Sequence, residues 1–250
     1  MLEIRGITQR FGGITALEDI SFQVTKGDIT GVIGPNGAGK TTLFNIVTGL
    51  YSQTAGSIFL DGNDISRLPA EQLASRGLVR TFQNIELFGN MTVLENVMLG
   101  LHTRSHSGIL ACMGKMPWHL REEQRIRSES LEWLEFCGIR DLAEQTAANL
   151  PFGKGRFLEI ARAMAVRPVI MLMDEPAAGL NNRETNELAE LIRKIRSTGV
   201  TIVLVEHDME LVMDICDRIV VLNLGSKLAE GTPQEIQENP AVIAAYLGEG

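Results

Sequence analysis

The chain has 250 residues, 44% hydrophobic and 22% charged, which suffices for one sizeable core with room for a subdomain. Its formal net charge of −8 gives no support for a surface that binds nucleic acid. The start of the chain has no signal-peptide pattern, and no apolar run approaches the ~20 residues that span a bilayer. We therefore expect a soluble protein whose membrane role comes through a partner.

The first third of the chain is predicted to be rich in strands. Partial alternation of apolar and polar residues indicates a small N-terminal sheet, with residues 11–13 as a loop. An apolar run ending at Ile33 indicates a buried strand, and Pro69 near a first turn indicates a helix. The expected strands are 2–9, 17–24, 29–33, 57–60 and 78–82, and the expected helices are 42–47 and 69–76.

The pattern becomes helical after residue 84. Thr92 and Glu95 form a capping-box pattern, and we expect a mostly helical subdomain over residues 84–166. Strands and helices alternate from Val169 onward, which favours a parallel sheet with helices on both faces. The expected helices are 122–137, 157–166, 183–197, 209–215 and 240–247, and the expected strands are 169–173, 201–205 and 218–223.

The segment Gly34–Thr42 fits G-x-x-x-x-G-K-[ST], the phosphate-binding loop. It lies between the apolar strand 29–33 and the expected helix 42–47, which is the context that the motif requires. Glycines let successive backbone N–H groups point at an anion, and the helix dipole adds positive charge. Lys40 supplies a charge for the β- and γ-phosphates, and the Thr41 hydroxyl is a ligand for Mg²⁺. We therefore predict a nucleotide site here.

Polar residues follow three further strands. Asp174 ends one strand and is placed to hold Mg²⁺, while the adjacent Glu175 is placed to polarise an attacking water. His207 follows the strand 201–205 and is predicted to bond the γ-phosphate or the water. Gln83 follows the strand 78–82, where its carboxamide reaches Mg²⁺ or the same water.

Other candidates depend on weaker signals. Phe11 offers an aromatic face for adenine, although a core Phe is equally compatible with the sequence. Residues 150–156 form a glycine-containing turn, here called the signature turn, which leads into a helix and can bind an anion. His102 and His106 have metal-type spacing without a third ligand, so we expect no metal there. The three cysteines are expected to be buried apolar residues in a reducing compartment: Cys112, Cys137 and Cys216.

In this order, the motifs resemble the ATP-binding cassette of ABC transporters over essentially the whole chain. Shorter segments look like the importers of branched-chain amino acids, and residues 102–127 look like an insertion in one of that system's two ATPase types. The segments that carry this finer likeness are 11–13, 81–84, 158–162, 174–181, 205–209 and 244–248.

The resemblance implies an α/β fold: a RecA-like P-loop NTPase core with an N-terminal antiparallel β subdomain and an inserted helical subdomain. The single cassette would comprise residues 1–83, 84–166 and 167–250. Two cassettes, identical or different, would sandwich two ATP molecules and drive membrane permease subunits, with a substrate-binding protein as an indirect partner. Such a subunit would be cytoplasmic and peripheral on the inner face of the cell membrane.

The resemblance also assigns roles to residues. Phe11 would stack on adenine, and Gly153 would contact the partner subunit's nucleotide. Glu175 would be the general base and His207 the γ-phosphate sensor, with Gln83 also at the catalytic centre. Thr41, Gln83 and Asp174 would bind Mg²⁺. The phosphates would be held by Asn36, Gly37, Ala38, Gly39, Lys40, Thr41 and Thr42.

Three positions depart from the family pattern. Pro151 stands where the signature turn usually has Ser, and Pro has neither a hydroxyl nor an N–H to offer. Lys154 replaces Gln and partly compensates with its charge, and Asn181 replaces an Asp. We therefore hypothesise that the protein works beside a second, different cassette and is a slow ATPase alone.

Alternatives remain open at this point. The cargo is expected to be branched-chain or other apolar amino acids, with small amides such as urea as an alternative. An ATPase for export of lipid or lipopolysaccharide is a rival, although such cassettes generally lack the 102–127 insertion. A non-transport ABC protein that acts on DNA or ribosomes, or an unrelated phosphate-loop NTPase, fits less well.

Overall fold

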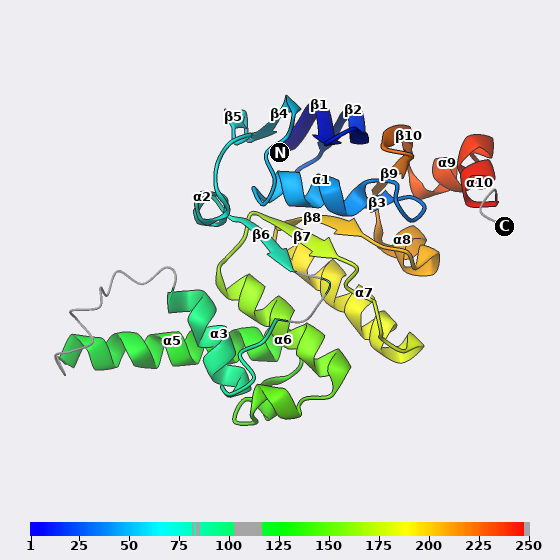
Figure 1. The fold of residues 1–250 in the computed structure, drawn as a ribbon. Helices are drawn as coiled ribbons and strands as arrows, with labels where there is room; N and C mark the ends of the chain where they lie inside the picture. Colours follow the sequence, from blue (N-terminus) through cyan, green and yellow to red (C-terminus); the bar gives the residue numbers. More distant parts are fainter. Residues whose placement is uncertain (82, 84–85, 103–116, 248–250) are drawn as a thin grey trace. The chain divides into compact units, whose positions relative to one another are not determined.

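The computed structural model describes residues 1–81, 83, 86–102 and 117–247. The chain divides into two compact units (Figure 1). Unit 1 comprises Met1–Gln83, Val169–Ala178 and Thr185–Gly250, and unit 2 comprises Asn84–Pro168 and Gly179–Glu184.

Unit 1 contains a four-stranded antiparallel sheet of order β2-β1-β4-β5. Leu2, Ile4 and Ile7 of β1 are buried, and the register of the ladder shifts between Ile4 and Ile7. The strands are β1 (Leu2–Phe11), β2 (Ile14–Val24), β4 (Ala55–Leu60) and β5 (Asn63–Asp64). The first two strands are longer than predicted, so that Phe11 ends β1 instead of lying in a loop. The ladder continues because Phe11 pairs with Ile14 across the short glycine turn.

A six-stranded sheet of order β10-β9-β3-β8-β7-β6 forms the centre of unit 1. All pairs are parallel except β9 with β10. Every residue of β3, β7 and β8 is buried, as expected of strands covered on both faces. The strands are β3 (Ile29–Ile33), β6 (Leu78–Thr81), β7 (Ile170–Asp174), β8 (Thr201–Val205), β9 (Arg218–Asn223) and β10 (Ser226–Gly231).

Helices cover both faces of this sheet. Figure 1 shows α1 between the two sheets, and its residues Leu43, Phe44 and Val47 join the core with side chains from both. On the other face lies α7, whose buried side is aliphatic. The helices are α1 (Lys40–Val47), α2 (Ala70–Ser75), α7 (Asn182–Ser197), α8 (Met209–Ile215), α9 (Pro233–Gln237) and α10 (Pro240–Leu247).

Unit 2 is built from α3 (Val93–His102), α5 (Pro117–Phe136) and α6 (Phe152–Ala165), with short 3₁₀ turns at Arg140–Leu142 and Ala147–Asn149. The capping box is confirmed: the Glu95 N–H donates to the Thr92 hydroxyl at 3.1 Å, and the Thr92 N–H donates to the Glu95 carboxylate at 2.8 Å. These bonds satisfy N–H groups that have no intrahelical partner.

The helix α6 begins at Phe152, whereas the sequence predicted a start at Phe157. Pro151 is its N-cap residue, with a φ of −55°, and the Gly155 N–H already donates to the Pro151 carbonyl at 3.0 Å. Gly153 allows close approach, since a Cβ there would overlap the Glu184 carboxylate. The signature turn is therefore largely the first turn of the helix, and Gly153 serves packing more than chain reversal.

Several expectations concern residues at the edge of the described part. Cys137 and Cys216 are buried, as predicted, whereas Cys112 lies outside the described residues. So do His106, Asn84 and most of the 102–127 insertion. Within the ranges that the structure describes, no helix is both long and apolar enough to cross a bilayer.

Candidate functional site

The phosphate loop connects β3 to α1 in unit 1, as the motif requires. Gly34 has a φ of 151°, and a Cβ at this position would overlap the Leu222 carbonyl of β9. Gly39 has a φ of 100°, and a Cβ there would lie 2.8 Å from the Ala16 carbonyl oxygen. Only glycine fits these two positions, so the curl of the loop is determined by its sequence.

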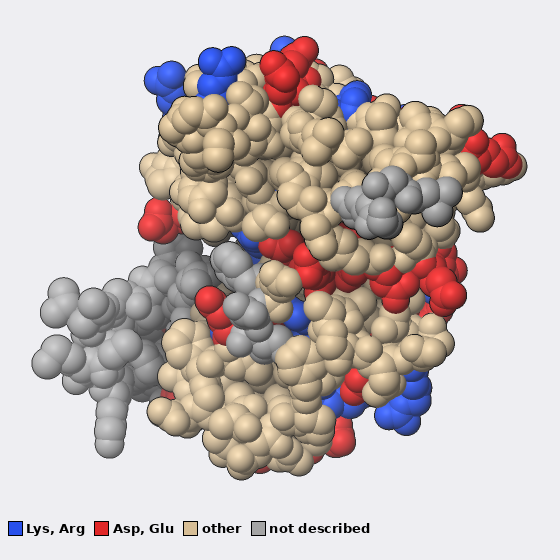
Figure 2. Space-filling model, turned by 45° about the vertical axis from the view of Figure 1, so that its right-hand side comes forward, with Lys and Arg blue, Asp and Glu red and all other residues tan. Residues whose placement is uncertain are grey.

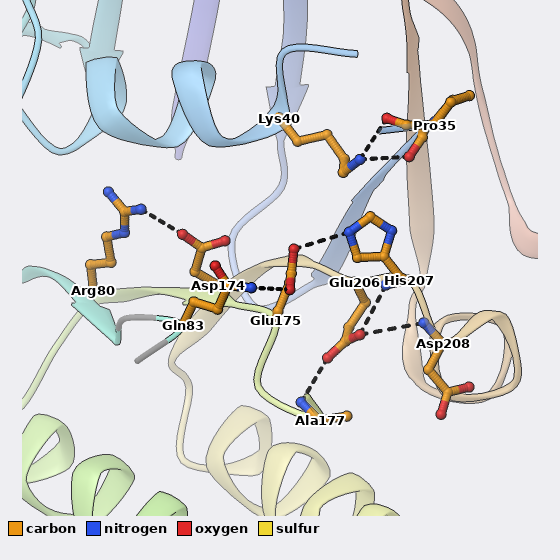
Figure 3. A network of polar contacts seen from close by, with 11 residues as sticks. Pro35, Lys40, Arg80, Gln83, Asp174, Glu175, Ala177, Glu206, His207 and Asp208 are labelled. Carbon is orange, nitrogen blue, oxygen red and sulfur yellow. Dashed lines mark hydrogen bonds and ion pairs between the residues drawn. The ribbon is translucent and has the colours of Figure 1, made fainter. Parts of the chain in front are cut away.

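Lys40 points back into this loop. Its Nζ donates to the carbonyl oxygens of Gly34 at 2.6 Å and Pro35 at 2.9 Å, and the residue is only 6% exposed (Figure 3). Asn36, Gly37 and Thr41 are exposed nearby, with Ala38 buried and Thr42 half-buried. No side chain in the described part of the chain caps α1, and its first turn carries no acid. A buried ammonium and a helix N-terminus thus face the same loop, which favours an anion.

Asp174, the last residue of β7, is buried beside Arg80 of β6. The Arg80 guanidinium donates to Oδ2 of Asp174 at 2.5 Å, and both side chains are less than a tenth exposed. Arg80 also donates to the Asn45 side chain at 2.7 Å and to the Thr48 hydroxyl at 3.2 Å, both at the end of α1. This network fixes the Asp174 carboxylate between two strands and a helix.

Glu175 contacts both of the other predicted catalytic side chains. Its Oε2 accepts a bond from Nε2 of Gln83 at 2.6 Å, and its Oε1 lies 3.0 Å from Nε2 of His207 (Figure 3). Glu175 has a φ of 46°, an uncommon conformation for a residue other than glycine. The structure thus brings Gln83, Glu175 and His207 together at the carboxyl ends of adjacent parallel strands.

Glu206 is a second buried carboxylate in this network, only 3% exposed. It accepts backbone N–H bonds from Ala177 at 2.7 Å, His207 at 2.9 Å and Asp208 at 3.4 Å. Burial raises its pKa, and the three N–H groups oppose that shift because they stabilise the ionised form.

Two predicted residues belong to other elements of the fold. Phe11 is 44% exposed at the end of β1, and its ring meets Tyr51 edge-on with the centroids 5.7 Å apart. Gly153 is in α6 of unit 2. Its predicted contact with a partner's nucleotide stays a prediction.

Arg80 and Glu206 received no role from the sequence. The signal for Arg80 was a charged residue inside the expected strand 78–82. The signal for Glu206 was a carboxylate directly after the expected strand 201–205, just as Asp174 directly follows the expected strand 169–173. Charged residues are rarely fully buried unless they are paired, so a charge next to or inside a buried strand predicts a specific partner.

The charges on the surface are mixed. On the face that Figure 2 shows, Lys and Arg side chains occur in small separate groups with Asp and Glu between them. Among the described residues, no three His, Cys, Asp or Glu side chains are grouped to hold a metal ion.

Comparison with known proteins extends the likeness over the whole chain. Residues 17–178 match the model of the ABC transporter family, and residues 226–250 match that of the branched-chain amino acid ATP-binding cassette transporter. The chain is 48% identical to the high-affinity branched-chain amino acid transport ATP-binding protein BraF of Pseudomonas aeruginosa, over 100% of this chain and 98% of that protein.

Solved structures give the same result for the fold. A nucleotide-free ATP-binding cassette from an ABC transporter superposes with a TM-score of 0.86 at 31% identity, covering 100% of this chain and 99% of the other. A dimeric cassette in a post-hydrolysis state, bound to ADP and Pi, gives a TM-score of 0.78 at 27% identity, covering 93% and 99%.

Proposed function

The chain belongs to the ABC transporter family of ATP-binding cassettes, and from this premise we propose that it is the ATP-hydrolysing subunit of an importer for branched-chain amino acids. The observation that carries the proposal is the contact of Glu175 with both Gln83 and His207, in the same unit as a phosphate loop that buries Lys40. The likeness of residues 226–250 to the branched-chain amino acid cassettes supports this cargo over urea or lipid.

In this proposal, the phosphate loop holds the triphosphate of ATP. Lys40 exchanges the carbonyl oxygens of Gly34 and Pro35 for phosphate oxygens, which are stronger acceptors because they are charged. The N–H groups of residues 37–42 add further donors at the start of α1. Phe11 stacks on adenine, and its edge-on contact with Tyr51 holds the ring at the end of β1.

The oxygen atoms of Thr41, Gln83 and Asp174 suit Mg²⁺, which prefers hard ligands. Arg80 occupies Oδ2 of Asp174 and so fixes the orientation of that carboxylate. When bound with ATP, Mg²⁺ neutralises negative charge on the phosphates.

Glu175 is proposed to orient and deprotonate the attacking water. Gln83 and His207 each contact one of its two oxygens and therefore hold the carboxylate between them. In the state with bound ATP, the imidazole of His207 would contact the γ-phosphate. The carboxamide oxygen of Gln83 would contact Mg²⁺. Hydrolysis is then sensitive to the position of both side chains.

A second cassette is proposed to complete each site. The dimeric relative bound to ADP and Pi supports such an assembly. Gly153 would present its N–H to the partner's nucleotide from the first turn of α6. The permease subunits lie in the membrane, so the chain is peripheral on its cytoplasmic face, and a substrate-binding protein delivers the cargo from the other side.

The test is to purify the tagged chain with its membrane partners and to rebuild the complex in lipid vesicles. Uptake of radiolabelled leucine, isoleucine, valine and urea is then measured with ATP, with the Lys40→Ala chain as control. We expect ATP-dependent uptake of the three amino acids only. Uptake of urea alone, or purification without any membrane protein, would contradict the proposal.

A further inference from the structure

Glu206 and Glu175 occupy equivalent places on neighbouring strands. Asp174, the last residue of β7, pairs in register with Val205, the last residue of β8, and the two glutamates come next on each strand. Their side chains diverge: Glu175 meets Gln83 and His207, whereas Glu206 points toward Ala177 and Asp208 (Figure 3). Glu206 therefore accepts backbone N–H bonds from two segments, the one that follows Glu175 and the one that contains His207.

Each of the two carboxylate oxygens of Glu206 bonds a different backbone segment. Oε1 accepts the Ala177 N–H at 2.7 Å, in the turn that follows Glu175. Oε2 accepts the N–H groups of His207 at 2.9 Å and Asp208 at 3.4 Å. One carboxylate thus ties the segment that carries the base to the segment that carries the imidazole.

Glu175 needs such support because of its backbone conformation. A φ of 46° persists only where the surroundings enforce it. The Glu175 N–H donates to the Val205 carbonyl at 2.9 Å, and the Ala178 N–H donates to the Glu175 carbonyl at 3.1 Å. The bond from the Ala177 N–H to the Glu206 carboxylate adds a side-chain constraint on this turn from the end of β8.

We propose that Glu206 is a positioning residue for ATP hydrolysis, which holds Glu175 and His207 at their 3.0 Å contact by bonding the backbone of both segments. This inference rests on the proposed function of Glu175 and His207. Stability alone does not explain a carboxylate here, because a buried charge is costly to desolvate and a neutral side chain would avoid that cost.

The test is Glu206→Gln in the full chain. The amide is nearly isosteric, but its nitrogen cannot accept, so one of the two backbone segments loses its acceptor. We expect kcat for ATP to fall by ~10-fold or more while KM and the Kd of a fluorescent ATP analogue change less than about two-fold.

The matched control is Asp217→Asn. Asp217 also accepts a backbone N–H, from Ile29 at 2.8 Å, but it lies at the amino ends of β3 and β9 in the same sheet. Its kcat should stay within about two-fold of the wild-type value even where its Tm falls.

A double-mutant cycle with His207→Ala separates positioning from general damage. Single-turnover hydrolysis should show that Glu206→Gln costs less than about three-fold once His207 is removed, because the two changes disrupt one arrangement. An unchanged kcat in Glu206→Gln, an equal loss in both backgrounds, or a parallel loss of nucleotide binding would each overturn the inference.

If Glu206→Gln does not fold, Glu206→Asp, which is one methylene too short for both segments, is judged by the same criteria. Failure of the proposed function itself is distinguished by Glu175→Gln, which would then hydrolyse ATP at the wild-type rate.

Discussion

Lys40 is the residue whose surroundings most directly predict a binding defect. In the structure its buried ammonium donates to two carbonyl oxygens of the loop, and a charged phosphate oxygen is a stronger acceptor than a carbonyl. We expect Lys40→Ala to weaken nucleotide binding by ~10-fold or more, since a hydrogen bond to a charged group contributes ~1.5–3 kcal/mol. Titration with a fluorescent ATP analogue measures this. Lys26→Ala, at an exposed turn, is the control and should bind normally. Near-normal binding by Lys40→Ala would refute the phosphate-loop assignment.

Cys216 illustrates how burial sets reactivity. Burial raises the pKa of its thiol to about 12, with the charges of Asp217 and Glu206 acting in the same direction. At pH 8 the thiolate fraction is then ~10⁻⁴, and the thiolate is the nucleophile. We expect iodoacetamide to leave Cys216 unmodified in the folded chain and to alkylate it in urea, as followed by peptide mass mapping. Rapid alkylation of the folded chain would show that the residue opens to solvent.

The sequence identified the residues whose position follows from strand ends, and it missed those whose role depends on distant neighbours. Gln83, Glu175 and His207 each follow a predicted strand, and parallel strands bring such residues to one edge. Arg80 bonds Asn45, Thr48 and Asp174, from segments that no local pattern connects to it. The roles of the site residues remain predictions, although their contacts are now defined.

At the scale of elements, Arg80 joins β6, β7 and the end of α1. Because this ion pair is buried, removal of one partner leaves an uncompensated charge, which typically costs about 3–5 kcal/mol. We therefore expect Arg80→Ala to lower the free energy of unfolding in urea by about that amount. The control is Arg193→Ala, whose pairs with Glu190 and Asp214 are exposed and should contribute at most ~1 kcal/mol. Equal losses in the two variants would mean that Asp174 does not depend on Arg80.

The start of α6 allows a test of the unusual signature turn. Pro151 is the N-cap residue and makes no side-chain cap bond among the described residues. A serine there offers a hydroxyl both to the helix N-terminus and to a partner's nucleotide. We expect Pro151→Ser to speed hydrolysis by the isolated chain, up to ~10-fold for each 1.4 kcal/mol restored to the transition state, and to matter less beside a different cassette.

Steady-state ATPase rates of wild type and Pro151→Ser, with and without the partner cassette, measure this effect. The Tm of each chain shows how much of the change is helix capping. Equal and fast rates for both isolated chains would show that Lys154 or the Gly153 N–H suffices.

Strands with strong patterns were predicted well, whereas elements set by tertiary contacts were not. The buried strands β3, β7, β8 and β9 are apolar throughout their length or nearly so, which leaves little choice of structure. The strand β10, Ser226–Gly231, was missed because its composition is not that of a strand. It exists because Leu224 and Gly225 turn the chain back and let it pair with β9.

For the whole molecule, the fold was predictable because the motifs occur in a fixed order over the full length. The ABC cassette at 31% identity covers all of this chain with a TM-score of 0.86, so the two chains share the architecture although most of their residues differ. Cargo is different, because it depends on contacts made by other subunits. The proposed cargo is therefore inferred from the likeness of this chain to its relatives.

The central claim is that Glu175 is the base of an ATP site completed by a second cassette. Glu175→Gln should keep its affinity for ATP but hydrolyse it ~10²-fold more slowly or worse, the usual range for loss of a general base. Closure without hydrolysis should then trap a dimer on gel filtration with Mg-ATP, whereas Glu190→Gln, on the exposed side of α7, should behave as wild type. A Glu175→Gln chain that hydrolyses ATP at the wild-type rate, or that elutes only as a monomer with Mg-ATP, would contradict the account.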